Sequence, residues 1–239
     1  MTADRNRILT VPRLDGISWL VHGFGTADWM EDDFASSEAL RDFRPVYLRQ
    51  IHTDIVRTPD PNTDESPEGD AWITDVPGFL LVIKTADCLP LLLADPRRRA
   101  VGAVHCGWRS TRLGIAAKAV QAMVERFGAD PAAIIAALGP CIGTPCYEVG
   151  PEVAREFRDA GLPDVLRPHP SDRERSLLDI REANKRQLLK SGLGANHIVS
   201  LDLCTRCEPA LHSWRRDRNP AARMLNFIGL HPPHRVSPQ

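Results

Sequence analysis

Three residues with metal-binding side chains stand where predicted strands end. His52 follows PVYLRQI, Cys88 follows LVIKTAD, and His105 follows AVGAV. Strand ends beside turns can present side chains to a pocket. Two imidazoles and a thiolate are competent zinc or copper ligands, and three protein ligands leave a fourth coordination position open to water. Because the three residues lie far apart in the chain, the alternative is a buried cysteine and two hydrogen-bonded histidines.

Asp87 precedes Cys88 directly, in the middle of the apolar stretch VIKTADCLPLLLAD. A strand core disfavours an acid, so this break either separates two strands or presents Cys88 to a ligand. Asp87 is also a candidate catalytic acid. However, neighbouring residues of a strand point to opposite faces, and this favours a supporting or turn role for Asp87.

Arg109 follows His105 closely, at the predicted start of a helix. A guanidinium can bind phosphate through two parallel hydrogen bonds, and the N–H groups of a helix start can assist it. We therefore expect Arg109 to bind phosphate, and the alternative is a surface salt bridge.

The remaining cysteines give weaker signals. Cys204 and Cys207 form a C-x-x-C pair without a second pair, which is typical of a redox pair, half a zinc site or a structural pair. Cys141 and Cys146 flank a turn, where we expect two buried thiols. Cys106 is expected to face away from the histidine that precedes it.

Two histidines and a basic run complete the candidates. His22 either lines the pocket or is a hydrogen-bonded core residue, and His212 lies near the site or is an exposed or capping residue. Arg215, Arg216 and Arg218 predict a solvated basic face.

The elements that must position these residues are short and mixed in type. Alternation and apolar runs predict strands at 18–24, 45–51, 79–83, 89–94, 100–105, 132–138, 197–201 and 223–228, with a loop at 58–69. Helices are predicted at 113–127, capped by Ser110 or Thr111 and ended by Gly128, at 151–160, and at 179–191, opened by Asp179 with Glu182 and stopped by Gly192. This order favours one α+β domain over residues 1–239, a mixed β-sheet flanked by helices.

Composition narrows the functional classes. The chain has 239 residues, 43% of them apolar and 26% charged, with a net charge of −1, so nothing indicates a nucleic-acid or membrane partner. The N-terminal residues do not resemble a signal peptide, and no apolar run is long enough to span a membrane. We therefore expect a cytoplasmic protein whose six cysteines are thiols or ligands rather than disulfides. The oligomeric state is open, and a monomer fits the sequence.

Five motifs, QIHTDIV, TADCLPLLLAD, VHCGWRSTRLGI, LGPCIGTPCYEVG and CTRCEPALHSWRRDR, resemble the laccase-domain family, long labelled polyphenol oxidase and described as purine nucleoside phosphorylases. The resemblance covers residues 22–228. It implies a single α+β domain whose zinc ligands match His52, Cys88 and His105. It also implies purine nucleosides and phosphate as substrates, with phosphorolysis of adenosine, inosine and S-methyl-5'-thioadenosine and deamination of adenosine. Two positions depart from the family pattern, Ala27 in place of an arginine and Ser110 in place of a glycine.

Zinc bound there would lower the pKa of its water to about 7, and the resulting hydroxide could attack C6 of adenine. Three alternatives remain. One is copper-dependent phenol oxidation, although the eight histidines include no His-x-His pair of the kind a trinuclear cluster needs. Another is hydrolysis of peptidoglycan precursors, with Cys88 as nucleophile and His105 as base. The third is a metal-stabilised binding protein without turnover.

Overall fold

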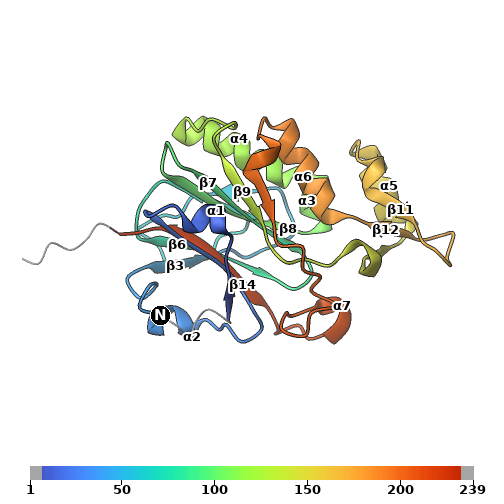
Figure 1. The fold of residues 1–239 in the computed structure, drawn as a ribbon, viewed down its shortest axis with the longest axis horizontal. Coiled ribbons are helices and arrows are strands. Elements are labelled where there is room, and N and C mark those ends of the chain that lie inside the picture. Colours follow the sequence, from blue (N-terminus) through green and yellow to red (C-terminus); the bar gives the residue numbers. More distant parts are fainter. Residues whose placement is uncertain (1–6, 233–239) are drawn as a thin grey trace, which may run out of the picture.

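The computed structural model of this chain describes residues 7–232. Two large sheets pack face to face, and helices α4 and α6 cover the outer face of the second sheet (Figure 1). The helices are α1 (Pro12–Asp15), α2 (Asp32–Ser36), α3 (Trp108–Arg112), α4 (Ile115–Phe127), α5 (Pro151–Asp159), α6 (Ile180–Lys190) and α7 (Trp214–Asp217). None of these helices is long and apolar enough to cross a membrane.

Both large sheets are mixed. The first sheet has the order β1 (Ile8–Leu9), β2 (Leu20–Gly25), β14 (Met224–Leu230), β6 (Phe79–Thr85), β3 (Arg44–Tyr47). The second has the order β13 (Ile198–Ser200), β9 (Ile135–Leu138), β7 (Leu89–Asp95), β8 (Ala100–Cys106), β5 (Ala71–Thr74), β4 (Val56–Arg57). Parallel pairs occur only toward the edges, β3 with β6 in the first sheet and β13 with β9 and β4 with β5 in the second.

A third, small antiparallel sheet has the order β10 (Glu148–Val149), β12 (Ser176–Leu178), β11 (Leu166–Pro168). With α5 it encloses a separate apolar cluster at one end of the molecule (Figure 1). The predicted α+β class with mixed pairing is confirmed, but the strands are divided among three sheets.

The strand β7 is apolar along its whole central part because both faces of its sheet are covered. Leu89, Leu91 and Leu93 pack in the cluster that includes α4 and α6, whereas Leu92 and Ala94 pack in the cluster between the two large sheets. Successive side chains of a strand point to opposite faces. A strand covered on both faces therefore reads as a continuous apolar run rather than an alternating one.

The Asp87–Cys88 break lies where the chain passes from one sheet to the other. The strand before it, β6, belongs to the first sheet, and the strand after it, β7, belongs to the second. Asp87 has a φ of 81°, in the left-handed region that few residues other than glycine adopt. The predicted break between two strands is confirmed, and it is a crossing between layers.

The helix predicted at 113–127 is α4, and a short helix that was not predicted, α3, precedes it and begins within HCGWRST. Gly114, with a φ of 83°, separates α3 from α4 and occupies the N-cap of α4, so the predicted caps Ser110 and Thr111 are wrong. Instead the Ser110 hydroxyl donates to the backbone carbonyls of His105 and Gly107, at 3.0 and 3.1 Å.

The other helix ends follow the sequence signals. Gly128 closes α4 in the left-handed conformation, as predicted. The Asp179 side chain accepts a hydrogen bond from the backbone N–H of Glu182 at 2.9 Å and caps α6. Gly192, with a φ of 97°, follows the end of α6.

Candidate metal centre

His52, Cys88 and His105 lie together beside the point where the chain crosses between the sheets. One potential ligand atom from each residue lies within 4.8 Å of the other two. The imidazole centroids of His52 and His105 are 4.9 Å apart, with their planes at 69°. His105 is buried within β8, Cys88 follows the turn after β6, and His52 lies in the loop between β3 and β4. Three segments that are distant in the chain thus present two nitrogens and a sulfur to one point.

Backbone conformation helps to place two of these segments. His52 has a φ of 58° and Asp87, next to Cys88, has a φ of 81°. Left-handed conformations of residues other than glycine cost about 1–3 kcal/mol each and gather at functional sites. The surrounding packing and hydrogen bonds must hold both turns in place.

Asp70 supports the centre from behind and was missed in the sequence analysis. Its fully buried carboxylate accepts a hydrogen bond from Nδ1 of His105 at 2.7 Å and from the backbone N–H groups of Thr53 and Ile51 at 2.6 and 3.3 Å. It therefore fixes the imidazole of His105 and both sides of the His52 turn, leaving Nε2 of His105 as the free nitrogen. The available signal was an acid at the entry to a wholly buried strand, in EGDAWIT.

The electrostatics of the two imidazoles differ. Burial, helped by the neighbouring His105, lowers the pKa of His52 to about 4, so His52 is neutral at pH 7, the form that binds metals. Burial also acts to lower the pKa of His105, but Cys88 and the hydrogen-bonded Asp70 outweigh it and raise that pKa to about 9. In the metal-free centre His105 is therefore protonated at pH 7, with its Nδ1–H donated to the Asp70 carboxylate. A cation would replace the other proton, on Nε2.

Two further observations fit a bound ion. Nδ1 of His52 is buried and has no hydrogen-bond partner among residues 7–232, and leaving such an atom unpaired costs about 1–3 kcal/mol. A Cβ at Gly107 would lie 2.5 Å from this nitrogen and 3.3 Å from Sγ of Cys88. The glycine therefore keeps the space between the donors clear. The donor set and this space fit a zinc or copper ion with an open coordination position.

Arg109 lies in the first turn of α3 with its guanidinium 4.5 Å from the Trp108 ring centroid. Its side chain is exposed, and within residues 7–232 no carboxylate pairs with it, so the predicted salt-bridge alternative is not observed. The charges of Arg109 and of Arg223 both act to lower the pKa of His52. Two cations therefore lie near the centre, and Arg223 was not among the predicted candidates.

Asp87 connects the centre to the C-terminal segment. Its carboxylate accepts hydrogen bonds from the Thr205 hydroxyl and from the backbone N–H of Arg215, both at 2.6 Å. Its backbone carbonyl accepts from the N–H of Ile142 at 2.9 Å. Both carboxylate oxygens are thus engaged, which is the supporting role that the turn position favours.

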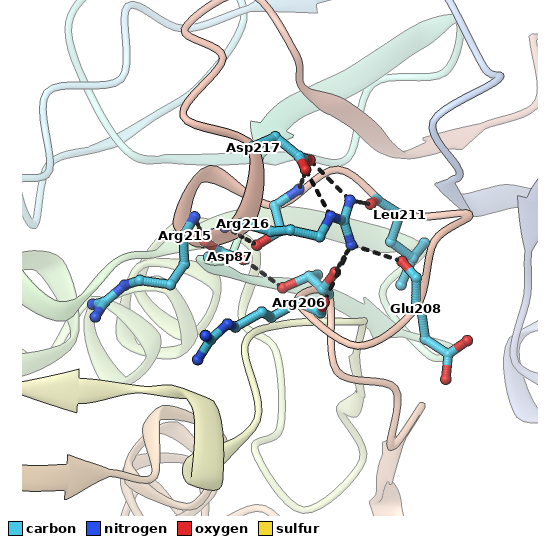
Figure 2. A network of polar contacts seen from close by, with 9 residues as sticks. Asp87, Arg206, Glu208, Leu211, Arg215, Arg216 and Asp217 are labelled. Carbon is cyan, nitrogen blue, oxygen red and sulfur yellow. Dashed lines mark hydrogen bonds and ion pairs between the residues drawn. The ribbon is translucent and has the colours of Figure 1, made fainter.

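Figure 2 shows that Arg216 organises the loop around these contacts. The guanidinium pairs with Asp217 at 2.7 Å. It also donates to the backbone carbonyls of four residues, Thr205, Arg206, Glu208 and Leu211. The prediction that these arginines form a solvated basic face therefore holds only in part. Arg216 donates hydrogen bonds to the backbone carbonyls of an irregular loop. Arg215 donates to the carbonyl of Glu148 at 3.1 Å. Arg218 is exposed and contacts the Trp214 ring.

The two remaining histidines lie outside the ligand group. His22 is a buried core residue whose Nε2 accepts a hydrogen bond from the Val11 N–H at 3.0 Å. This is the second of the two predicted alternatives, a hydrogen-bonded core histidine. His212 is half-buried, and burial lowers its pKa.

The cysteines divide into buried thiols and a second group. Cys106 and Cys141 are fully buried in the apolar cluster beneath α4. Cys146, predicted to be buried, is half-exposed and lies beside Cys204 and Cys207.

Residues 32–231 match the family described as multi-copper polyphenol oxidoreductase laccase, and the chain belongs to this laccase-like family. A Deinococcus radiodurans purine nucleoside phosphorylase is 45% identical over 166 residues, 68% of this chain and 62% of the relative, so the match spans less than two thirds of that protein. The Shigella flexneri purine nucleoside phosphorylase YfiH is 32% identical over 93% of this chain and 89% of its own length. The predicted family is confirmed.

Two further relatives extend the comparison. The adenosine deaminase RL5, from an unknown prokaryotic organism, is 39% identical over 141 residues, 58% of this chain and 53% of the relative. The crystal structure of the Bacillus licheniformis hypothetical protein YfiH superposes with a TM-score of 0.85 at 27% identity, covering 95% of this chain and 97% of that one. Relatives named as nucleoside enzymes thus share this sequence pattern, and a solved YfiH shares the fold.

Proposed function

We propose that this chain is a zinc-dependent purine nucleoside phosphorylase, with the metal held by His52, Cys88 and His105. The observation that carries the proposal is the convergence of these three donors within 4.8 Å, with Asp70 fixed behind one of them. The names of the relatives supply the substrate class. The substrates are adenosine, inosine and S-methyl-5'-thioadenosine, and deamination of adenosine is a second reaction of the same centre.

Each residue of the centre has a separate task. A bound zinc ion supplies a Lewis acid and brings the pKa of its water to about 7. Asp70 holds the His105 imidazole so that Nε2 points toward the donors, and His52 presents a neutral nitrogen. Gly107 keeps the space clear. Asp87 fixes the turn that carries Cys88 by binding Thr205 and Arg215.

Phosphorolysis needs a cation for the second substrate. The bond between C1' of the ribose and the purine nitrogen breaks with its electron pair going to the base, which takes up a proton, while a phosphate oxygen bonds to C1'. Arg109 is exposed, has no carboxylate partner in the described chain, and lies in the first turn of a short helix beside the centre. It binds the phosphate dianion and holds one oxygen toward the sugar.

The central test uses metal analysis and phosphate dependence together. Protein purified without added metal should contain zinc, and should cleave inosine only when phosphate is present. Copper in place of zinc would favour the phenol-oxidising alternative, for which a phenol is the test substrate. Inosine cleavage at an unchanged rate without phosphate would contradict phosphorolysis.

One arrangement favours a second candidate function. Cys88, His105 and Asp70 form a chain of contacts like the nucleophile, base and orienting acid of a thiol hydrolase. The variant Cys88→Ser separates the two functions. If the variant loses both its metal and its phosphorolysis activity, Cys88 is a metal ligand. If it keeps the metal but loses activity, Cys88 is a nucleophile acting on peptidoglycan precursors. The control variant is Cys106→Ala, which removes a buried thiol of the core and should keep both metal and activity.

A further inference from the structure

A second group of sulfur donors lies outside the centre described above. Cys146 ends the short 3-10 helix Thr144–Cys146, and Cys204 and Cys207 lie in the loop after β13. The three sulfur atoms lie within 4.8 Å of one another, with Sγ of Cys146 and Sγ of Cys207 at 3.6 Å. All three are free thiols.

Backbone pairing holds the two segments together. The N–H of Thr205 donates to the carbonyl of Cys141 at 3.1 Å, and the N–H of Cys141 donates to the carbonyl of Leu203 at 3.3 Å, so the segments form a short parallel bridge. Within the C-x-x-C turn the N–H of Cys207 donates to the carbonyl of Cys204 at 3.1 Å. The sulfur positions therefore follow from the backbone and do not depend on flexible side chains alone.

One sulfur also receives a backbone hydrogen bond. The N–H of Gly143 donates to Sγ of Cys204 at 3.1 Å, a contact that favours the thiolate. A Cβ at Gly143 would lie 3.2 Å from both Sγ and Cβ of Cys204, closer than most side chains pack, so the glycine permits this approach. The contact therefore holds one donor sulfur in place.

We propose that Cys146, Cys204 and Cys207 form a second metal site, a thiolate site for a soft ion such as Zn²⁺ or Cu⁺. Three sulfur donors without imidazole or carboxylate match the preference of these ions. Binding forms three metal–sulfur bonds and releases the remaining thiol protons to solvent. Cys207 is exposed, so a fourth position of a tetrahedral ion faces solvent.

The site also bears on the first centre. Thr205 lies between the two loop cysteines and donates its hydroxyl to Asp87, the neighbour of Cys88. An ion that fixes this loop would hold the Asp87 contact in place. The proposal rests on the geometry of the sulfurs and is independent of the reaction assigned to the first centre.

The test titrates the reduced, metal-free protein with Cd²⁺ under argon and follows the ultraviolet charge-transfer band of cadmium–thiolate bonds. The wild-type chain should bind two ions, and the variant Cys146→Ser/Cys204→Ser/Cys207→Ser should bind one. Because Cys88 then supplies the single remaining thiolate ligand, its band should fall to about a quarter of the wild-type band. The control Cys106→Ala should keep the whole band.

A single variant guards against a folding defect. Cys207→Ser changes an exposed side chain, so its far-ultraviolet circular dichroism should match the wild type while its cadmium band falls by at least half. The same loss of one ion should appear by mass spectrometry of the native protein. An unchanged band in the triple variant, or an equal number of bound ions in the triple variant and the reduced wild-type chain, would overturn the second site. So would a Cys146–Cys207 disulfide that forms in air while the reduced thiols bind no ion.

Discussion

The two groups of donors differ in their surroundings and in their chemistry. His52, Cys88 and His105 mix nitrogen and sulfur, lie at the crossing between two sheets, and have a buried carboxylate behind them. The cysteine group of Cys146, Cys204 and Cys207 is all sulfur, lies on a short 3-10 helix and a loop, and is supported by backbone N–H groups.

The difference indicates two uses of a metal. A donor set held rigidly from behind, with space kept clear by a glycine, suits an ion that must accept a substrate at an open position. A sulfur set on loops suits an ion that holds those loops together. The hydrogen bond between Asp87 and Thr205 joins the two donor groups. The effect of a substitution can therefore be measured at both groups.

The largest effect is expected from Asp70→Asn. The amide cannot accept hydrogen bonds from both His105 and the His52 turn with the charge that the carboxylate provides. Loss of such a supporting contact lowers metal affinity or activity about 10–100-fold. Metal content and inosine phosphorolysis measure the effect.

The matched control for that variant is Asp54→Asn, a partly exposed carboxylate nearby that pairs with Lys118. It should leave metal and activity near wild type. Equal losses in both variants would show that Asp70 has no special role, and a smaller cadmium band at the cysteine group in Asp70→Asn would remove the contrast between the two regions.

A smaller effect is expected from Arg109→Ala. Removing a charged hydrogen-bond donor should raise the KM for phosphate about tenfold, corresponding to about 1.4 kcal/mol, with little change in the KM for inosine. Adenosine deamination, which uses no phosphate, should be unaffected. Arg97→Ala, at an exposed arginine paired with Asp130, is the control. An unchanged KM for phosphate would remove Arg109 from the proposal.

Thr205→Val tests the connection between the regions. It removes the hydroxyl that donates to the buried Asp87 carboxylate and should lower the free energy of unfolding by about 1–3 kcal/mol. Chemical denaturation measures this loss, and Thr10→Val, which removes an exposed hydroxyl bonded to Asp15, should cost much less. If the two variants are equally stable, the Asp87 contact does not contribute.

The smallest effect on either donor group is expected at His22, which contacts neither. Burial lowers its pKa to about 4 from 6.5. The unfolded chain therefore binds this proton more tightly, and stability falls as the pH drops from 6.5 toward 4, by as much as ~3 kcal/mol from this residue. In His22→Gln the pH dependence of the free energy of unfolding should be correspondingly shallower, with metal content at pH 7 unchanged. A slope identical to that of the wild type would show that His22 is not buried in its neutral form.

The local signals in the sequence singled out the three residues whose donor atoms the structure brings within 4.8 Å of one another, and the resemblance to a known family assigned them to one metal ion. Each stands near the end of an apolar run, and strand ends are visible without knowing which strands pair. The break between two strands at Asp87 could also be predicted, because an acid within a buried apolar run indicates a turn. The crossing from one sheet to the other could not be predicted, since periodicity does not indicate which sheet a strand joins.

Contacts between distant segments account for what was missed. Asp70 meets His105 because β5 pairs with β8, a register that the two strand sequences do not specify. Cys146 meets the C-x-x-C turn through the bridge between Cys141 and Cys204. The role of Arg216 depends on the path of an irregular loop, which composition does not define.

The most direct test of the central claim is zinc X-ray absorption on the variant that lacks the three cysteines of the second group. With that group removed, the account predicts one zinc ion with one sulfur neighbour at about 2.3 Å and two imidazole nitrogens at about 2.0–2.1 Å. Further substitution of Cys88 by serine should remove the bound zinc and with it the zinc absorption signal. A chain from zinc-replete cells that carries no zinc, or zinc without a sulfur neighbour, would contradict it.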